Sequence, residues 1–206
     1  MEELKVLVRD GDDAGAVGRV QGLLDEGRAP ETIMNEALIP AMDEVGELFQ
    51  KGEYYLPEML IAARAMKSGL EVLRPLLVES GAEPAGRIAI GTVKGDMHDI
   101  GKNLVGMALE GAGFEVIDLG VDVPPARFVE VTEEHRPVAI GLSALLTSTM
   151  VSMGDVVRAI ESAGLRDRVK IMIGGAPVTR AFCDEIGADF YGDDPTAGRD
   201  YARSLV

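Results

Sequence analysis

The sequence has little of several residue types that mark particular protein classes. Its 206 residues include one cysteine, Cys183, and no tryptophan, and aromatic residues make up 4%. A single cysteine excludes a disulfide framework and a thiolate metal cluster, and it suits a reducing compartment. The scarcity of aromatic rings argues against a surface on which the bases of single-stranded nucleic acid stack.

Positive charge is also scarce, because 20 lysines and arginines stand against 35 aspartates and glutamates, giving a formal charge of −15. Nucleic-acid binding needs a basic face, so we expect no nucleic-acid partner. No apolar run approaches the roughly 20 residues of a membrane span. The first residues are acidic and lack the basic-then-apolar order of a signal peptide. We therefore expect a cytoplasmic protein with no membrane partner.

Residues 1–80 have the rhythm of helices. The chain is 47% hydrophobic, enough for a packed core, and apolar residues recur every three or four positions in this part. Pro30 and Pro57 suit the first turn of a helix, whereas Pro40 falls inside a periodic run and should kink it. This pattern predicts a four-helix bundle with short connections.

The rhythm changes after residues 78–87, a segment with two glycines and a proline that we interpret as a linker. Short apolar runs then alternate with helix-like stretches. These runs are residues 88–93, 114–120, 138–144, 170–175 and 188–193. The alternation predicts an α/β fold in residues 81–206, a flavodoxin-like, doubly wound, parallel five-stranded sheet. Ligands of such sheets bind beyond the carboxyl ends of the strands.

One of the two histidines lies at such a strand end. His98 is in the stretch TVKGDMHDIGKNLVG, residues 92–106, with Asp96 two positions before it. In an extended segment the two side chains point the same way, so the carboxylate can orient the ring. The other ring nitrogen is then left as a metal ligand or a base. His135 lies near a predicted helix end, and we give it no role.

Three common motifs do not fit this stretch. A phosphate-binding loop needs four residues between its glycines, but five separate Gly95 from Gly101, and Asn103 follows Lys102. The dinucleotide pattern G-x-G-x-x-G is absent after the first predicted strand. A zinc enzyme needs about three protein ligands. A lone histidine suits a metal that brings most of its ligands with it, as a metal in a macrocycle does.

Three separated elements together resemble the motif of proteins that bind cobalamin with its own base displaced. They are Asp96-x-His98-x-x-Gly101, Ser143-x-Leu145 and the pair Gly174–Gly175. Residues 102–142 and 146–173 separate them, and both spacings match the family pattern.

The resemblance implies a role for each position. His98 would be the lower axial ligand to cobalt, with Asp96 as its hydrogen-bonding partner and Thr149 extending the pair into a proton relay. Ser143 would meet the displaced nucleotide tail, and the paired glycines would leave room for it. The implied cofactor contacts in this part of the chain are Gly95, Asp96, Met97, His98, Asp99, Gly101, Ser143, Leu145, Thr147, Gly174 and Gly175.

Residues 46–77 resemble the helical bundle that precedes the cobalamin module in methyl-transfer proteins, including the cap domain of cobalamin-dependent methionine synthase. The resemblance implies that residues 1–80 cap the upper face of the corrin, with Phe49 and Leu56 at the apolar cap positions.

The whole chain thus resembles the corrinoid proteins of methyltransferase systems. Such a protein would bind cobalamin base-off and His-on, and carry a methyl group between two methyltransferases. The first would act on the methylated substrate, and the second on tetrahydrofolate or a thiol coenzyme. The implied partners are barrel-type methyltransferases and a reductive activator, with this chain as a non-catalytic carrier subunit. Two alternatives stay open, a cobalamin-responsive sensor and a family member that binds no cofactor.

Overall fold

The computed structural model describes residues 1–80 and 84–206, so part of the predicted linker at 78–87 lies outside the described residues. The chain divides into two compact units, a helical one and one built on a sheet. The helical unit comprises Met1–Pro84 with Glu110–Gly113, and the sheet unit comprises Ala85–Leu109 with Phe114–Val206. The domain boundary that the sequence places after residue 80 stays a prediction.

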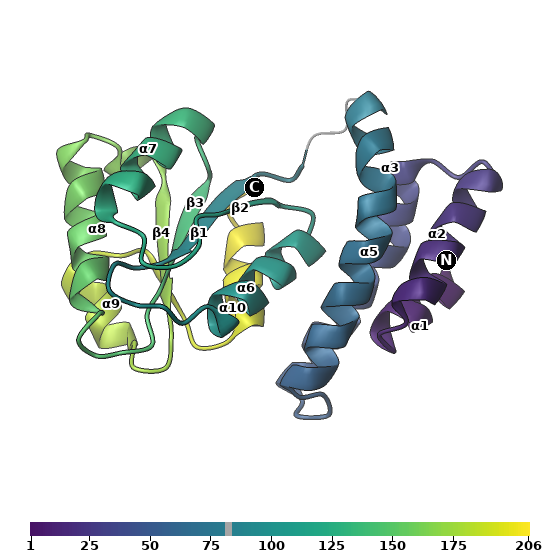
Figure 1. Ribbon diagram of the computed structural model, residues 1–206, viewed down its shortest axis with the longest axis horizontal. Coiled ribbons are helices and arrows are strands. Elements are labelled where there is room, and N and C mark those ends of the chain that lie inside the picture. The colour runs from purple at the N-terminus through teal and green to yellow at the C-terminus, as the bar shows by residue number, and fades with distance from the viewer. Residues whose placement is uncertain (81–83) are drawn as a thin grey trace. The chain divides into compact units, whose positions relative to one another are not determined.

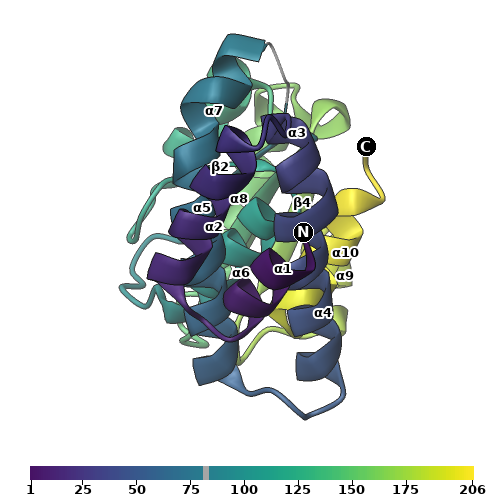
Figure 2. The same cartoon turned by 90° about the vertical axis from the view of Figure 1, so that its right-hand side faces the viewer.

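The helical unit consists of helices that pack side by side (Figures 1 and 2). In order they are α1 (Glu2–Arg9), α2 (Asp13–Asp25), α3 (Pro30–Ile33), a π-helical turn (Met34–Leu38), α4 (Ile39–Gln50) and α5 (Leu56–Ser80). Helix α5 packs against α1, α2 and α4. Because α3, the π turn and α4 follow without a break, the described residues of this unit form four helical segments, as the periodicity predicts.

Three prolines of the helical unit, Pro30, Pro40 and Pro57, are expected to mark helix starts or a kink, and a fourth, Pro75, lies inside α5. Pro30 is the first residue of α3, and Pro57 is the second residue of α5. Pro40 has no N–H with which to bond the carbonyl four residues earlier, and its ring crowds that carbonyl. The π-helical turn lies directly before it, and the amide of Ile39 bonds back five residues to Met34. The chain therefore meets Pro40 with a π turn inside a continuous helical run, and the kink itself stays a prediction.

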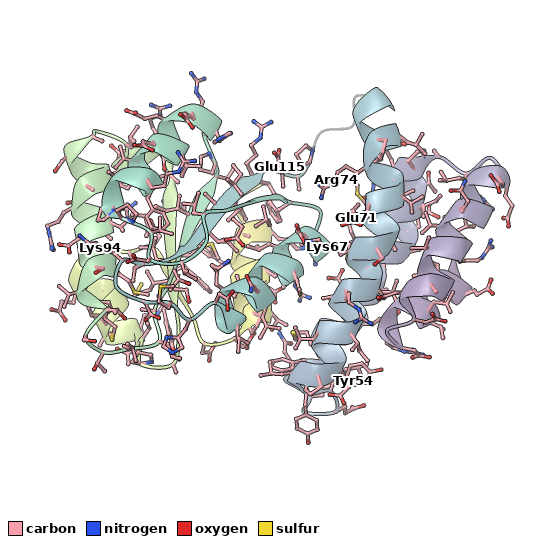
Figure 3. All side chains as sticks on the ribbon, in the orientation of Figure 1. Tyr54, Lys67, Glu71, Arg74, Lys94 and Glu115 are labelled. Atoms are coloured by element: carbon pink, nitrogen blue, oxygen red, sulfur yellow. The ribbon has the colours of Figure 1, made fainter. Side chains whose placement is uncertain are left out.

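Helix α5 has one apolar and one polar face. Met59, Met66 and Leu73 are buried. Lys67, Glu71 and Arg74, drawn in Figure 3, are exposed and are spaced four and three residues apart, which places them together on the polar face. Among the described residues, no helix is both long enough and apolar enough to span a bilayer.

The second unit is a five-stranded parallel sheet with strand order β2-β1-β3-β4-β5 (Figure 1). The strands are β1 (Arg87–Thr92), β2 (Glu115–Asp118), β3 (Ala139–Ser143), β4 (Lys170–Gly174) and β5 (Phe190–Gly192). The helices are α6 (Ile100–Gly111), α7 (Pro125–His135), α8 (Val151–Ser162), α9 (Arg180–Ile186) and α10 (Pro195–Arg203). The predicted flavodoxin-like, doubly wound sheet is confirmed.

Helices cover both faces of this sheet, α7, α8 and α9 on one and α6 and α10 on the other (Figure 1). Phe128 of α7, Ile160 of α8 and Cys183 of α9 are fully buried in one apolar cluster with the central strands. A surface ion pair joins Arg87 to Glu115 at the first residues of β1 and β2. A core on both faces leaves the strand ends as the place where irregular loops converge.

The register brings the motif residues into one row at the carboxyl ends of the strands. Thr92 of β1 pairs with Ser143 of β3, and Ser143 pairs with Gly174 of β4. On the far side Gly174 pairs with Gly192 of β5. Residues that are distant in the sequence therefore share one edge of the sheet, where the loop carrying His98 also begins.

Candidate functional site

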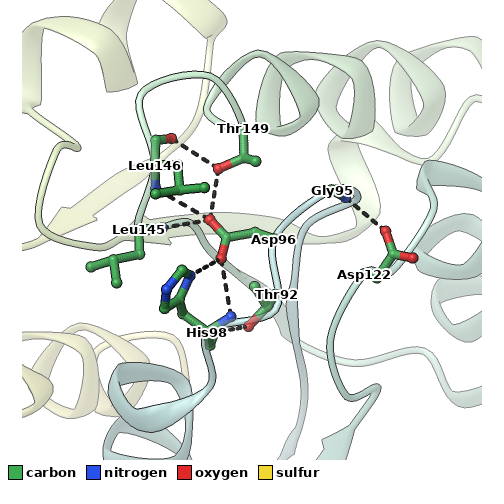
Figure 4. Close-up of polar contacts among 8 residues, drawn as sticks. All are labelled: Thr92, Gly95, Asp96, His98, Asp122, Leu145, Leu146 and Thr149. Carbon is green, nitrogen blue, oxygen red and sulfur yellow. Dashed lines mark hydrogen bonds and ion pairs between the residues drawn. The ribbon is translucent and has the colours of Figure 1, made fainter.

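The candidate site is built on the loop between β1 and α6, which carries Asp96 and His98 (Figure 4). The hydroxyl of Thr92, the last residue of β1 and fully buried, donates to the carbonyl oxygen of His98 at 2.8 Å. The carbonyl of Asp99 accepts from the amide of Asn103 and so closes the first turn of α6. The strand end and the helix start thereby fix the backbone on either side of the histidine.

The predicted contact between Asp96 and His98 is present. Oδ1 of Asp96 lies 2.7 Å from Nδ1 of His98 and also accepts from the backbone N–H of His98 at 3.1 Å. The Asp96 side chain is fully buried, whereas the His98 side chain is 51% exposed. When Nδ1 carries the proton that faces the carboxylate, Nε2 keeps its lone pair and can serve as a ligand.

The second oxygen of Asp96 is held by the loop that follows β3. Oδ2 accepts from the amides of Leu145 and Leu146 at 2.8 and 3.2 Å, and from the hydroxyl of Thr149 at 2.7 Å. Burial raises the pKa of the Asp96 carboxyl, but hydrogen bonds from Thr149, Leu145 and His98 outweigh burial and hold it well below its ordinary value. The carboxylate is therefore ionised and fixed in direction.

Thr149 lies where the resemblance places a relay hydroxyl. The residue is buried, and its Oγ1 is 2.8 Å from the carbonyl of Leu146 as well as 2.7 Å from Asp96. A hydroxyl has one proton to donate, and a charged acceptor makes the stronger hydrogen bond. The Thr149 hydroxyl therefore donates to the Asp96 carboxylate and not to the Leu146 carbonyl. Thr149, Asp96 and His98 form one hydrogen-bonded chain from the buried loop to the exposed imidazole.

The two glycines of the Gly-Gly pair have different surroundings. A Cβ on Gly175 would lie 1.9 Å from the carbonyl oxygen of Ala144, and its φ is +132°. A side chain there would collide with the protein's own backbone, which is a reason for glycine that involves no ligand. A Cβ on Gly174 would lie 3.2 Å from the carbonyl of Gly192. At both positions, backbone carbonyls at the strand ends therefore limit the room for a side chain.

Gly101, in the first turn of α6, faces open space, since a Cβ there would meet no atom within 4 Å. Large apolar side chains are exposed on the two loops that hold Asp96 and at the first residues of α6 and α8, the helices that follow these loops. They are Met97, Ile100, Leu145, Leu146 and Val151. Exposed apolar side chains around one polar group are typical of a site that a large, partly apolar ligand covers.

The donor set also fits a metal that brings most of its own ligands. In the part of the chain that the structure describes, no three His, Cys, Asp or Glu side chains are grouped to hold a metal ion. One exposed imidazole with an oriented Nε2 is the arrangement that a macrocycle with a free axial position needs. These residues therefore fit a corrinoid.

The remaining predicted residues are less constrained. Gly95 takes a positive φ of +86° in the turn before Asp96, and Asp99 and Thr147 are exposed loop residues. Phe49 and Leu56 belong to the helical unit, at opposite ends of the connection between α4 and α5. Phe49 is half-buried and Leu56 is exposed.

Sequence reasoning missed three supports of the site. They are the Thr92 hydroxyl, the amide of Leu146 and Asp122, whose carboxylate accepts from the amide of Gly95 at 2.7 Å. Thr92 and Asp122 both lie near the carboxyl ends of strands, and that position is the one signal that could have drawn attention to them.

Comparisons with known proteins identify the family to which the whole chain is similar. A family model described as a B12 binding domain matches residues 86–199, and a second model with the same description matches residues 1–74. Dimethylamine corrinoid protein 1 of Methanosarcina acetivorans is 45% identical over 192 residues, covering 93% of this chain and 88% of that protein. The trimethylamine corrinoid protein of Methanosarcina barkeri is 44% identical over 191 residues, covering 92% and 88%.

Two solved structures are similar over nearly the whole chain. A cobalamin-binding protein from Desulfitobacterium hafniense has a TM-score of 0.82 at 32% identity, covering 100% of this chain and 98% of that one. A chain of the methanol:cobalamin methyltransferase complex from Methanosarcina barkeri has a TM-score of 0.88 at 27% identity, covering 98% and 78%. With the family models and these relatives spanning both units, the chain belongs to the B12-binding family of corrinoid proteins.

Proposed function

We propose that this protein is a methyl carrier, which binds cobalamin base-off and His-on and carries a methyl group between two methyltransferases. Similar proteins are named as dimethylamine and trimethylamine corrinoid proteins, and a similar chain belongs to a methanol:cobalamin methyltransferase complex. Bound cobalt would supply the chemistry that accepts and gives up the methyl group. The observation that carries the proposal is the exposed His98 ring fastened at Nδ1 to the buried, ionised Asp96.

In this proposal each residue of the hydrogen-bonded chain has a distinct task. His98 would hold the metal of the corrinoid through Nε2, the ring nitrogen that is not bonded to Asp96. Asp96 keeps the proton on Nδ1 and fixes the plane of the ring. Thr149 holds Asp96 in place, and together they form the path for the proton that accompanies binding and release of the imidazole.

The rest of the site holds the body of the cofactor. Ser143 and the Gly174–Gly175 pair receive the displaced nucleotide tail at the carboxyl edge of the sheet. Gly101 gives the macrocycle a close approach to the backbone, with Gly95, Met97, Asp99, Leu145 and Thr147 as further contacts. We assign the upper face to the helical unit through Phe49 and Leu56. Exposed apolar side chains at the start of α5, among them Leu60 and Ile61, have the chemistry for that role.

The partners we propose follow from the similar chain that belongs to a methanol:cobalamin methyltransferase complex. We propose that a barrel-type methyltransferase loads the methyl group and a second passes it to tetrahydrofolate or a thiol coenzyme. The third partner we propose is a reductive activator. The carrier itself performs neither transfer alone.

Reconstitution with cobalamin under anaerobic conditions tests this function. We expect stoichiometric binding and a His-on absorption spectrum, which His98→Ala loses and His135→Ala keeps. His135 is the matched control, because it is the one other histidine and ends α7. Identical spectra for wild type and His98→Ala would refute the axial role.

A second assay separates a methyl carrier from a cobalamin sensor. The reduced holoprotein is incubated with a dimethylamine- or trimethylamine-specific methyltransferase and its substrate, and methyl transfer to the corrinoid is followed. Transfer supports the carrier. Tight cobalamin binding without transfer from either enzyme would favour the sensor.

A further inference from the structure

Asp122 has an unusual backbone conformation close to the candidate site. It follows β2, and its φ of +54° makes it one of two non-glycine residues with positive φ in the described part of the chain. The other, Arg136, ends helix α7, where a left-handed residue is an ordinary helix terminus. No helix ends at Asp122, and such conformations persist where the surrounding contacts hold them.

Two hydrogen bonds join Asp122 to the loop that carries Asp96, as Figure 4 shows for the side chain. Its carboxylate accepts from the amide of Gly95 at 2.7 Å, and its own amide donates to the carbonyl of Asp96 at 3.0 Å. Asp122 therefore holds the backbone on both sides of the bond between Gly95 and Asp96.

The neighbouring backbone fixes Asp122 itself. The amide of Val123 donates to the carbonyl of Thr92 at 2.9 Å, and Val93 and Val123 form an isolated parallel bridge. The loop after β2 is thus paired with the end of β1. The left-handed turn at Asp122 is what directs both its amide and its carboxylate at the same short stretch of loop.

This contact has a consequence for the imidazole. The backbone of Asp96 sets the direction of its buried side chain, and one oxygen of that side chain holds Nδ1 of His98. We propose that Asp122 is a positioning residue for His98, acting through the backbone of Gly95 and Asp96. This inference rests on the proposed function, in which His98 is the axial ligand.

Three substitutions separate the possible effects. Asp122→Asn keeps an acceptor oxygen and tolerates positive φ, so it should behave like wild type. Asp122→Gly adopts positive φ freely but loses the acceptor, so it isolates the hydrogen bond to Gly95. Asp167→Gly is the control, because Asp167 is an exposed aspartate in the turn Arg166–Arg168, before the start of β4.

The first measurement uses the protein without cofactor. Nitrogen and carbon NMR of the two histidine rings reports which ring nitrogen carries the proton, and His135 serves as an internal reference. We expect Asp122→Gly to shift the His98 ring signals toward a mixture of tautomers, with His135 unchanged. Wild-type His98 signals in Asp122→Gly, or equal shifts in Asp167→Gly, would overturn the proposal.

The second measurement uses cobalamin-loaded protein under anaerobic conditions. For Asp122→Gly we expect cobalamin still to bind while the ratio of His-on to His-off spectra falls about fivefold, the equivalent of one hydrogen bond. Asp122→Asn should restore the wild-type ratio, and an unchanged ratio in Asp122→Gly would count against the proposal. If Asp122→Gly does not fold, Asp122→Ala, which also lacks the acceptor, is measured in its place.

The two proposals fail in different ways. If wild type shows no His-on spectrum, the axial role of His98 is wrong, while the NMR measurement without cofactor still decides what Asp122 does to the ring. If wild type is His-on and Asp122→Gly is as well, the proposed function stands and the role of Asp122 is refuted.

Discussion

Asp96 shows why a buried charge can be retained at a single position. Its carboxylate is removed from water, which is costly unless hydrogen bonds replace the lost hydration. The groups that donate to it are the backbone and ring of His98, the amides of Leu145 and Leu146, and the hydroxyl of Thr149. These donors come from two loops that are distant in the sequence, so the ionised side chain also fastens the loops together.

The pH dependence of stability should reflect this carboxylate. Because its pKa is lower in the folded protein, Asp96 contributes stability that is complete above its unfolded pKa of about 3.9. That contribution is lost as the pH falls through the folded pKa. We expect Asp96→Asn to cost about 2 kcal/mol at pH 7 and the difference from wild type to narrow as the solution is acidified. Urea unfolding between neutral and acidic pH measures both, with Asp167→Asn as an exposed control.

Gly101 and Gly175 should respond oppositely to alanine. Gly175→Ala places a Cβ against the Ala144 carbonyl at positive φ, so we expect a strongly destabilised protein. Gly101→Ala enters open space in a helix and should raise the stability of the cofactor-free protein by about 0.5–1 kcal/mol. Urea unfolding measures both changes.

The same Gly101→Ala protein tests whether the macrocycle lies on α6. A methyl group at an empty surface should not change a protein without ligand, but it should obstruct a flat ligand in close contact with the backbone. We expect cobalamin affinity to fall while the fold gains stability. Unchanged affinity in a cobalamin titration would show that Gly101 does not approach the cofactor.

At the level of helices and strands, a buried lysine links α6 to β2. The Lys102 side chain is 3% exposed, and its ammonium lies 2.6 Å from Oδ2 of the half-exposed Asp118 and 2.8 Å from Oδ1 of Asn103. A buried charge that loses its partner is costly, whereas an exposed charge that loses its partner returns to water. The pair should therefore be energetically asymmetric.

We expect Asp118→Ala to lower the free energy of unfolding by about 3 kcal/mol, because it strands the ammonium inside the protein. Lys102→Met keeps the apolar stem and leaves Asp118 to be solvated, so its cost should be clearly smaller. The difference between the two losses is measured from the urea midpoints of the two variants, provided that the dependence of the unfolding free energy on urea concentration is unchanged. Equal losses would mean that the pair acts only as a packing contact.

The sequence predicts these elements well where local chemistry decides. Five apolar runs separated by helical stretches are enough to predict β1 to β5. Pro30 and Pro57 mark helix starts, because the N–H that proline lacks would have no partner within the first turn of a helix. Pro40 shows the limit. Its effect on the helix can be foreseen, but a π turn rather than a break depends on packing around it.

The site is predictable to the same degree. The spacing of Asp96 and His98 predicts their contact, because it is local. The amide of Leu146 and the carboxylate of Asp122 act across the sheet edge, and no local pattern encodes the positive φ of Asp122. The reason for glycine at position 175 is the backbone of Ala144, a contact that only the assembled strands create.

At the scale of the whole molecule, electrostatics is dominated by an excess of acidic residues. The formal charge is −15, and many ion pairs are between exposed groups, such as Arg158 with Asp155, at 65% and 50% exposure. Exposed pairs of this kind contribute little and are screened by salt. Repulsion among the unpaired carboxylates acts over longer distances and opposes the compact state.

Salt should therefore stabilise this protein. Between about 0.02 and 0.5 M NaCl the screening length shortens from more than 10 Å to a few Å, which weakens net repulsion more than it weakens close pairs. We expect the urea midpoint of the cofactor-free protein to rise with NaCl at pH 7. The rise should shrink near pH 4.5, the isoelectric point, where little net charge is left to screen. A midpoint that falls with salt at pH 7 would mean that specific ion pairs outweigh the repulsion of the whole surface.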